Sequence, residues 1–444
     1  MAAGCMDTTR RADVLVAARD SFSRIGRRFV RRRRWTPSLV AMGLVVLVGR
    51  CGLTSIEGLM EIMADLAGWD SVPSDSTFVE ARQALQRLRP QAILELWQDL
   101  AAQALEVIPS TRRTIGGLRW IAVDGSWVWT PRSASLVRRY GRPKAGDGKL
   151  LHYPQALMVT ALDVLTRIPV AIGVRGHADG ERNLLRGFLD SFQAGMVAMF
   201  DRGFPAKDLL WELTSRQAHV LWRMGTAEAN SWDCVYQFLR DPAKPREALA
   251  TIRVPAADGG GEIRQIQVRL IRRVFRRGRP KTGQKRETMV LMTTLLDEKA
   301  WPADRLVDMY ERRWVIESWF GDLKVRFDLE SFHSTTADGV EQEIFALMAW
   351  ITLCGIVERD AYRRIERSRG KQDPEDPLRY QISYANLYHV CAQLMAQIVA
   401  GLPIAAILDR SERSLNWLSQ TARKRRPGRT NPRVRKAPAG RWKS

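Results

Sequence analysis

The fold prediction for this chain begins with the stretch RWIAVDG, residues 119–125. Its apolar run, Trp120 to Val123, has the length and composition of a short buried strand, and Asp124 follows at the expected end of that strand. The pattern recurs at MVAMF, residues 196–200, which precedes Asp201. A carboxylate beside an apolar core is costly unless it is paired or bound to a metal ion. Taken alone, however, either aspartate could simply cap the turn that follows it.

The patterns around these two strands predict a mixed α/β fold. Segments 156–162 and 168–174 are rich in strand-forming residues and predict an antiparallel meander with the strand at 120–123. A helical stretch near 184–192 then precedes the strand at 196–200. Strands that alternate with helices in this way are typical of α/β domains.

A β-rich segment and a long helix follow. Short alternating runs from Thr226 to about Glu287 predict a β-rich insertion, and residues 290–294 predict one more strand. A helix is expected from near Pro302 to about Phe327, because proline suits the first helical turn. Further helical segments are expected at two places, 341–357 and 382–408.

The two ends of the chain have different compositions. Residues 39–107 carry apolar positions at helical spacing, interrupted at 68–73, and predict a small helical domain. Arginines crowd residues 24–34, which predicts a basic arm for phosphates, although a merely solvated basic stretch remains an alternative. The tail after Arg423 is expected to be basic and disordered.

The composition favours a polyanionic partner. The 444 residues include 70 Lys and Arg against 48 Asp and Glu, which leaves a net charge of +22. The longest apolar run, 38–49, is shorter than the roughly 20 residues of a membrane span, so no transmembrane helix is expected. The 5 cysteines are far apart and form no C-x-x-C pair, which predicts a reducing cytoplasm and no zinc knuckle. The 5 histidines are isolated and predict no ligand set.

A row of polar side chains on the predicted long helix decides whether Asp124 and Asp201 are turn caps or metal ligands. Tyr310, Arg313, Glu317 and Lys324 fall within an arc of roughly 60° at about 100° per residue. An intrahelical salt-bridge row would explain the pair of Arg313 and Glu317, but it leaves the other two residues without a role. Three carboxylates with a cationic row suit two-metal phosphoryl transfer, since carboxylates bind hard divalent cations and Arg and Lys bind phosphate oxygens.

The residues of this polar row resemble the motif of a known family. The spacing Y-x2-R-x3-E-x6-K, met by Tyr310, Arg313, Glu317 and Lys324, is the motif of a large group of bacterial insertion-sequence DDE transposases. The surroundings VDGS at 123–126 and FDRGF at 200–204 are similar as well. The resemblance covers about Arg119 to Ala346.

The resemblance implies a fold and a chemistry. The fold would be α/β, with a ribonuclease-H-like catalytic core interrupted by the β-rich insertion and flanked by helical N-terminal and C-terminal regions. Asp124 would bridge two Mg²⁺ ions, for which Mn²⁺ can substitute, and Asp201 and Glu317 would each complete one metal site. Tyr310, Arg313 and Lys324 would hold DNA phosphates.

The implied reaction is cleavage at the ends of the element, followed by attack of the new 3′-hydroxyl on target DNA. The partner would be double-stranded DNA, at transposon ends and target, with the protein acting as a homodimer in the bacterial cytoplasm at the nucleoid. Related enzymes also pass through a hairpin and stabilise a flipped base, and the candidates here for the aromatic residue involved are Trp232 and Phe275. Asp163, Asp179 and Glu181 could add acidity to the site but are not assigned to it.

Two alternatives from other classes remain. A catalytically inactive relative would only bind DNA, but the complete set of Asp124, Asp201 and Glu317 argues against it. A paired-carboxylate glycosidase would leave the charge of +22 unexplained.

The predicted regions follow from these assignments. They are a helical DNA-binding region with the basic arm (1–112), the first part of the catalytic core (113–225), the β-rich insertion (226–295), the second part of the core (296–360), a helical C-terminal region (361–422) and the basic tail (423–444).

Overall fold

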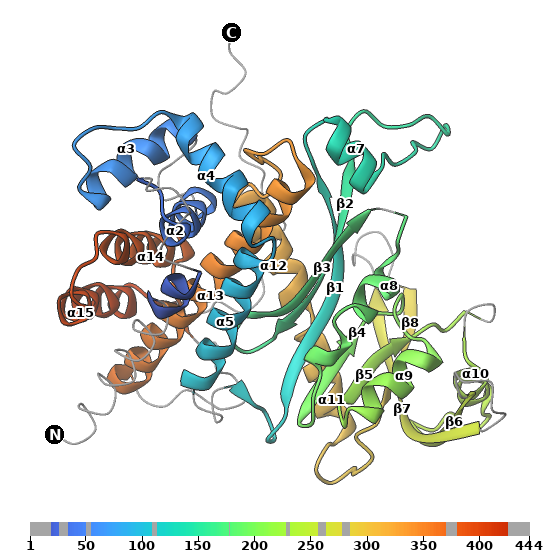
Figure 1. Cartoon of the computed structure of the whole chain (residues 1–444). Coiled ribbons are helices and arrows are strands. Elements are labelled where there is room, and N and C mark those ends of the chain that lie inside the picture. The colour runs from blue at the N-terminus through green and yellow to red at the C-terminus, as the bar shows by residue number, and fades with distance from the viewer. Residues whose placement is uncertain are drawn as a thin grey trace, which may run out of the picture.

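The computed structural model describes residues 19–25, 34–49, 55–108, 113–176, 178–227, 231–255, 263–277, 285–369 and 380–424. These residues form a helical region on one side and a helix-covered sheet on the other (Figure 1). The predicted mixed α/β class is therefore confirmed.

The first part of the sheet combines an antiparallel meander with two parallel strands. Its strands are β1 (Arg119–Trp129), β2 (Gln155–Asp163), β3 (Pro169–Gly176), β4 (Met196–Phe200) and β5 (His219–Met224). β2 pairs antiparallel with both β1 and β3, as predicted. β4 lies parallel to β1, and β5 lies parallel to β4. The carboxyl ends of β1 and β4 therefore face the same way.

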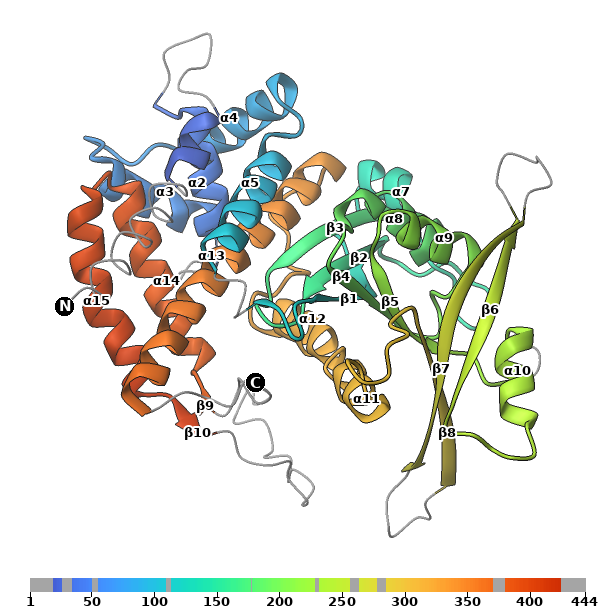
Figure 2. The ribbon, with the colours of Figure 1, turned by 90° about the horizontal axis from the view of Figure 1, so that it is seen from below.

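The predicted insertion extends the same sheet. Its strands are β6 (Glu247–Pro255), β7 (Ile263–Arg277) and β8 (Lys285–Thr293). β8 pairs antiparallel with β5, so the full strand order is β3-β2-β1-β4-β5-β8-β7-β6. The region also contains a helix that the sequence pattern did not predict, α10 (Asp233–Arg240), which buries Val235 and Phe238. The long strands reach well beyond the rest of the sheet (Figure 2).

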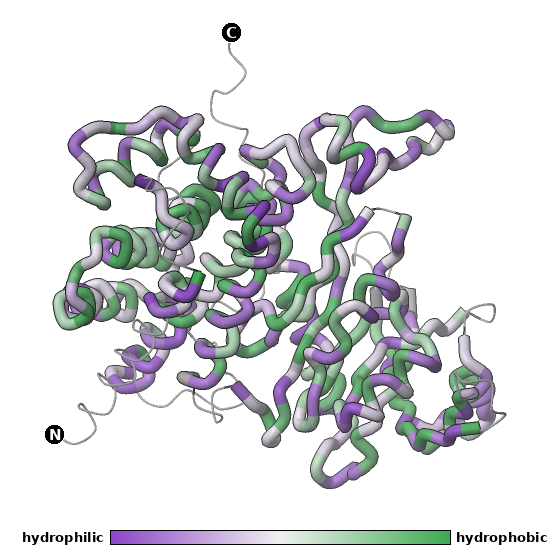
Figure 3. Tube along the Cα trace, in the orientation of Figure 1, coloured by the Kyte–Doolittle hydropathy of each residue, from purple (hydrophilic) through white to green (hydrophobic). Residues whose placement is uncertain are grey.

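Helices cover both faces of the sheet. Residues of β1 point alternately to the two faces, because side chains alternate along a strand. Ile121 and Val123 belong to the core that includes α8 (Glu181–Arg186) and α9 (Lys207–Ser215), whereas Trp120 and Ala122 belong to the core that includes α11 (Ala303–Glu311) and α12 (Trp314–Val325). A short 3₁₀ turn, Leu189–Ser191, follows α8. The apolar residues run through the strands and the inner helices (Figure 3).

The helix expected from Pro302 to Phe327 is divided in two, so this prediction was wrong in its continuity. α11 ends at Glu311 and α12 begins at Trp314. Between them the Arg313 N–H donates to the Tyr310 carbonyl at 3.0 Å, three residues back instead of four. The apolar spacing continues across this tightened turn, since Met309 and Ile316 are both buried, and it therefore concealed the break.

The terminal helices form one bundle. It consists of α2 (Pro37–Val48), α3 (Ile56–Ala67), α4 (Asp75–Leu88), α5 (Ala92–Val107), α13 (Ala337–Arg369), α14 (Tyr384–Val399) and α15 (Ile404–Gln420). The helix predicted at 341–357 is longer in the structure and continues to Arg369 without a break. The segment predicted as one helix at 382–408 is interrupted, because Gly401 adopts a φ of +68° and Pro403 then caps α15. A single hydrophobic core joins the helices from both ends of the chain.

Smaller elements complete the described structure. α7 (Ala134–Tyr140) follows β1, and a two-stranded ladder joins β9 (Tyr380–Gln381) to β10 (Arg423–Lys424). The predicted basic arm is described only in part, and the tail beyond residue 424 lies outside the described residues. The described residues also leave out Cys5, Cys51 and His177.

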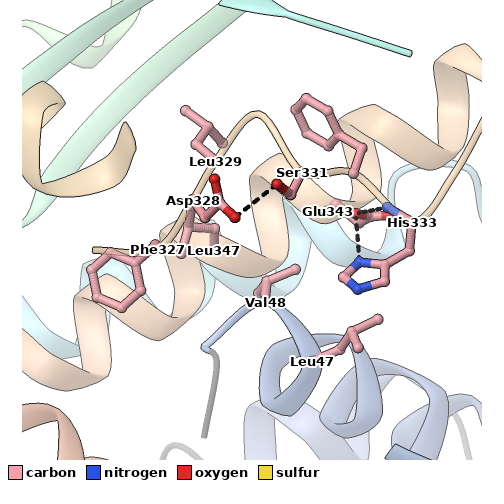
Figure 4. Close-up of a pocket in the computed structure, with 10 residues that line it drawn as sticks. Leu47, Val48, Phe327, Asp328, Leu329, Ser331, His333, Glu343 and Leu347 are labelled. Atoms are coloured by element: carbon pink, nitrogen blue, oxygen red, sulfur yellow. Dashed lines mark hydrogen bonds and ion pairs between the residues drawn. The ribbon is translucent and has the colours of Figure 1, made fainter. Parts of the chain in front are cut away.

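A buried ion pair within the bundle shares its carboxylate with the segment that follows α12. Arg82 Nη1 on α4 lies 2.9 Å from Glu343 Oε1 on α13. The other oxygen of Glu343 accepts a hydrogen bond from the His333 backbone N–H at 2.9 Å. Figure 4 shows this carboxylate beside a small pocket lined by Leu47 and Leu347. The network fixes the chain just after the helix that carries Glu317.

One described helix, α13, is long and apolar enough to cross a membrane by length and composition alone. However, 72% of its most apolar window is buried inside the protein. This burial is that of a core helix.

Candidate active site

Asp124 lies within β1 and not at its end, so the predicted strand end was wrong. β1 continues to Trp129 because its register with β2 holds past Asp124, which faces Thr160, as far as Gln155. The pairing with β4 stops earlier, at Ala122 and Met199. Asp124 therefore occupies the position where β1 separates from β4.

Asp201 directly follows β4, as predicted. Its Oδ1 accepts a hydrogen bond from the Gly203 backbone N–H at 2.6 Å, which is the local turn expected of an aspartate at this position. Because β1 and β4 are parallel neighbours, Asp124 and Asp201 lie at the same edge of the sheet. Burial, and then the negative charge of Asp201, raise the pKa of Asp124, although the Arg313 guanidinium opposes them.

Arg313 joins two of the predicted site residues. Its Nη1 lies 3.2 Å from Asp124 Oδ2, and its Nη2 lies 2.6 Å from Glu317 Oε1. Arg313 itself is 6% exposed. Its buried Nε has no hydrogen-bond partner among the described residues. The predicted i,i+4 pair exists, but the same guanidinium also brings α12 to β1.

Tyr310 and Lys324 contact the backbone around the same carboxylates. The Tyr310 hydroxyl donates to the Phe200 carbonyl, at 3.3 Å, immediately before Asp201. Burial raises the pKa of Tyr310 to about 12. Lys324 donates to the Trp127 carbonyl of β1, three residues after Asp124. The structure thus brings the whole predicted row to β1 and to the end of β4, although the row spans two helices.

Glu181 lies near Asp124 and Asp201, although the sequence pattern did not assign it to the site. It is the first residue of α8, and its Oε1 lies 2.1 Å from the point that a Cβ on Gly125 would occupy. Burial raises the pKa of Glu181, and the charges of Asp124 and Asp201 raise it further. The signal in the sequence was weak, because Glu181 has no fixed spacing from the other carboxylates.

The other two acidic residues that the sequence does not assign to the site, Asp163 and Asp179, do not join this cluster. Asp163 ends β2 and is paired with Arg119 at 3.1 Å. Its Oδ1 also accepts the Thr166 backbone N–H at 2.9 Å, so its role is structural. Asp179 is exposed.

The carboxylates fit a hard divalent cation by their chemistry. In the described part of the chain, no three His, Cys, Asp or Glu side chains are already gathered around one metal position. Asp124, Asp201 and Glu181 nevertheless supply only oxygen donors, and Gly125 leaves the space that a side chain would fill. Their mutual repulsion is what a bound cation would relieve.

A basic cavity lies beside Asp201. It has a volume of about 740 Å³, and Arg182, Arg202, Arg223 and Trp232 contribute to its lining. Arg223 is paired with Glu287 at 3.1 Å, whereas Arg202 is exposed. Of the two aromatic candidates, Trp232 lines this cavity, and Phe275 packs against the core that includes α11 and α12.

The family comparison and the sequence comparison agree on one class of protein. A family model described as "Transposase DDE domain" matches residues 115–353. The transposase InsG for insertion sequence element IS4 of Escherichia coli (strain K12) is 22% identical over 272 residues, which cover 60% of this chain and 58% of that relative. The chain thus matches less than two thirds of the relative's length. A solved piggyBac transposase synaptic complex with hairpin DNA has a TM-score of 0.42 at 10% identity, covering 90% of this chain and 82% of that one.

Proposed function

This chain belongs to the transposase DDE domain family, and from that membership we propose that it is a DNA transposase that cleaves the ends of an insertion sequence and joins them to target DNA. The observation that supports it best is that Arg313 pairs with both Asp124 and Glu317, beside the strand that precedes Asp201. Asp124 and Asp201 come from neighbouring parallel strands, and Arg313 ties Glu317 to Asp124.

We propose that Asp124, Asp201 and Glu317 hold two Mg²⁺ ions. Such ions would supply Lewis acidity and neutralise charge on the phosphoryl group during in-line displacement. Arg313 is a positioning residue, since it is buried between two carboxylates and keeps α12 against β1. Lys324, which is partly exposed, is better placed than the buried Tyr310 to reach a DNA phosphate.

The proposed reaction has two steps. In the first, water attacks the phosphorus at the end of the element and the 3′ oxygen leaves with a proton. In the second, that 3′-hydroxyl attacks a phosphodiester of the target and displaces another 3′ oxygen. Both steps need the same arrangement of carboxylates, because each is an in-line substitution at phosphorus.

The fold and charge support the same proposal. We propose that the strand order β3-β2-β1-β4-β5, with its antiparallel meander and two parallel strands, is a ribonuclease-H-like core, into which β6, β7 and β8 are inserted. The net charge of +22 and the basic cavity beside Asp201 suit double-stranded DNA as partner. A homodimer on DNA, in the cytoplasm at the nucleoid, remains part of the proposal.

The test begins with the DNA that flanks the gene. Short inverted repeats found there would be placed on a linear duplex, and the purified protein would be incubated with it and Mg²⁺. We expect nicks at the repeat ends, new 3′-hydroxyls, and no cleavage in excess EDTA. Cleavage that persists in EDTA would contradict the metal mechanism, and specific binding without cleavage would favour the inactive relative.

A further inference from the structure

Glu181 approaches the carboxylate site from the face opposite to α12. α8 begins directly after Gly180, and Arg182 Nε donates to the Gly203 carbonyl at 3.0 Å. That bond joins the start of α8 to the loop that follows Asp201. The backbone around Glu181 is therefore held next to the site.

Two glycines leave room for this side chain. Glu181 Oε1 lies 2.1 Å from the position of a Cβ on Gly125, so a side chain there would force the Glu181 carboxylate to move. Its Oε2 lies 3.9 Å from the corresponding position on Gly203, and Asp201 Oδ1 lies 3.1 Å from that same position. The carboxylates of Glu181 and Asp201 thus converge on one side of the strand that carries Asp124.

The two sides of the site differ in charge balance. On the α12 side, Arg313 lies between Asp124 and Glu317 and offsets their charges. On the α8 side, neither Glu181 nor Asp201 forms an ion pair with any described residue. Partly buried carboxylates that face each other without a cation are unfavourable, unless a ligand supplies the missing charge.

We infer that Glu181 is a fourth metal-binding carboxylate of this site, and that a divalent cation binds first on the α8 side, between Glu181, Asp201 and Asp124. This inference rests on the proposed function. It adds a residue to the triad, and it places the weaker cation site on the α12 side, where Arg313 competes for Asp124 and Glu317.

The test is a titration of the full-length protein with Mn²⁺, without DNA, in which free Mn²⁺ is measured by electron paramagnetic resonance. Glu181→Gln should weaken the tightest Mn²⁺ binding by about 10- to 100-fold, the range found when a group that supports a metal site is lost. Asp179→Asn, an exposed acidic residue two positions earlier, is the matched control and should bind Mn²⁺ like the wild type. Asp201→Asn is the benchmark and should bind weakly.

Thermal melts without metal show whether each variant is folded. We expect Glu181→Gln to melt at or above the wild-type temperature, because it removes a repulsive charge, and Gly125→Ala to weaken Mn²⁺ binding as Glu181→Gln does. Unchanged Mn²⁺ affinity in folded Glu181→Gln, with loss in Asp201→Asn, would overturn the inference alone. Absence of Mn²⁺ binding by the wild type would overturn both the inference and the proposed metal mechanism.

Discussion

Replacing Arg313 with alanine should destabilise the protein far more than an ordinary helix salt bridge would. Arg313 makes two charge-assisted hydrogen bonds, at 3.2 Å to Asp124 and 2.6 Å to Glu317, and its side chain is 8% exposed. Each such bond contributes about 1.5–3 kcal/mol. Glu317 is 36% exposed, so water compensates part of its loss, and we expect the free energy of unfolding to fall by about 3 kcal/mol in total.

The assay is urea unfolding at neutral pH in EDTA. Arg326→Ala is the matched control, since Arg326, at the C-terminal cap of the same helix, forms an i,i+4 pair with Asp322 at 2.8 Å but is 44% exposed. It should cost less than about 1 kcal/mol. Arg313→Lys should fall between the two, because a single ammonium cannot bridge both carboxylates in the same way. Equal losses for Arg313→Ala and Arg326→Ala would refute the bridging role.

Three further predictions address the surroundings of the site. Lys324→Ala should flatten the dependence of DNA affinity on log salt by about one unit of slope. Tyr310→Phe should leave that slope unchanged and lower the free energy of unfolding by about 1 kcal/mol. The reverse pattern would make Tyr310 the residue that binds phosphate and Lys324 the structural one. Ca²⁺ should support DNA binding with little cleavage, because its coordination is looser and less regular than that of Mg²⁺. Full cleavage in Ca²⁺ would show that the reaction does not need the octahedral geometry of Mg²⁺. Burial acts to raise the pKa of Glu343, but hydrogen bonds from His333 and the charge of Arg82 together lower it below 4.5. The charged Glu343 therefore stabilises the protein above pH 4.5, and this contribution is lost as the pH falls through the lowered pKa. Glu343→Gln should lower the free energy of unfolding by about 3–5 kcal/mol at pH 7 and by less at pH 3, as measured in denaturant melts. A loss that does not depend on pH would show that the charge is not responsible.

The sequence patterns located the strands of the site but not where β1 ends. Asp124-Gly125 resembles a turn, because both residues favour turns locally. In the structure the pairing of β1 with β2 continues to Trp129 and overrides that local preference. The strand before Asp201 was located correctly, because β4 is short, fully buried and followed at once by a turn.

Helical spacing was similarly informative in part. It placed Arg313 and Glu317 on one face, and the structure confirms their ion pair. It could not reveal the break after Glu311, since the apolar residues on both sides of the break face the same core. Nor could spacing reveal Glu181, whose proximity to Asp124 and Asp201 depends on how α8 packs on β2 and β3.

The most direct test of the catalytic carboxylates compares cleavage with binding in the same preparations. Asp124→Asn, Asp201→Asn and Glu317→Gln would each be assayed on end-containing duplex DNA in Mg²⁺, with Asp179→Asn as control. We predict that the three variants lose cleavage to background and keep DNA affinity within a few-fold of the wild type, because phosphate contacts from Lys and Arg supply most of that affinity. Cleavage at the wild-type rate by any folded variant of the three would remove that residue from the active site and contradict the proposed mechanism.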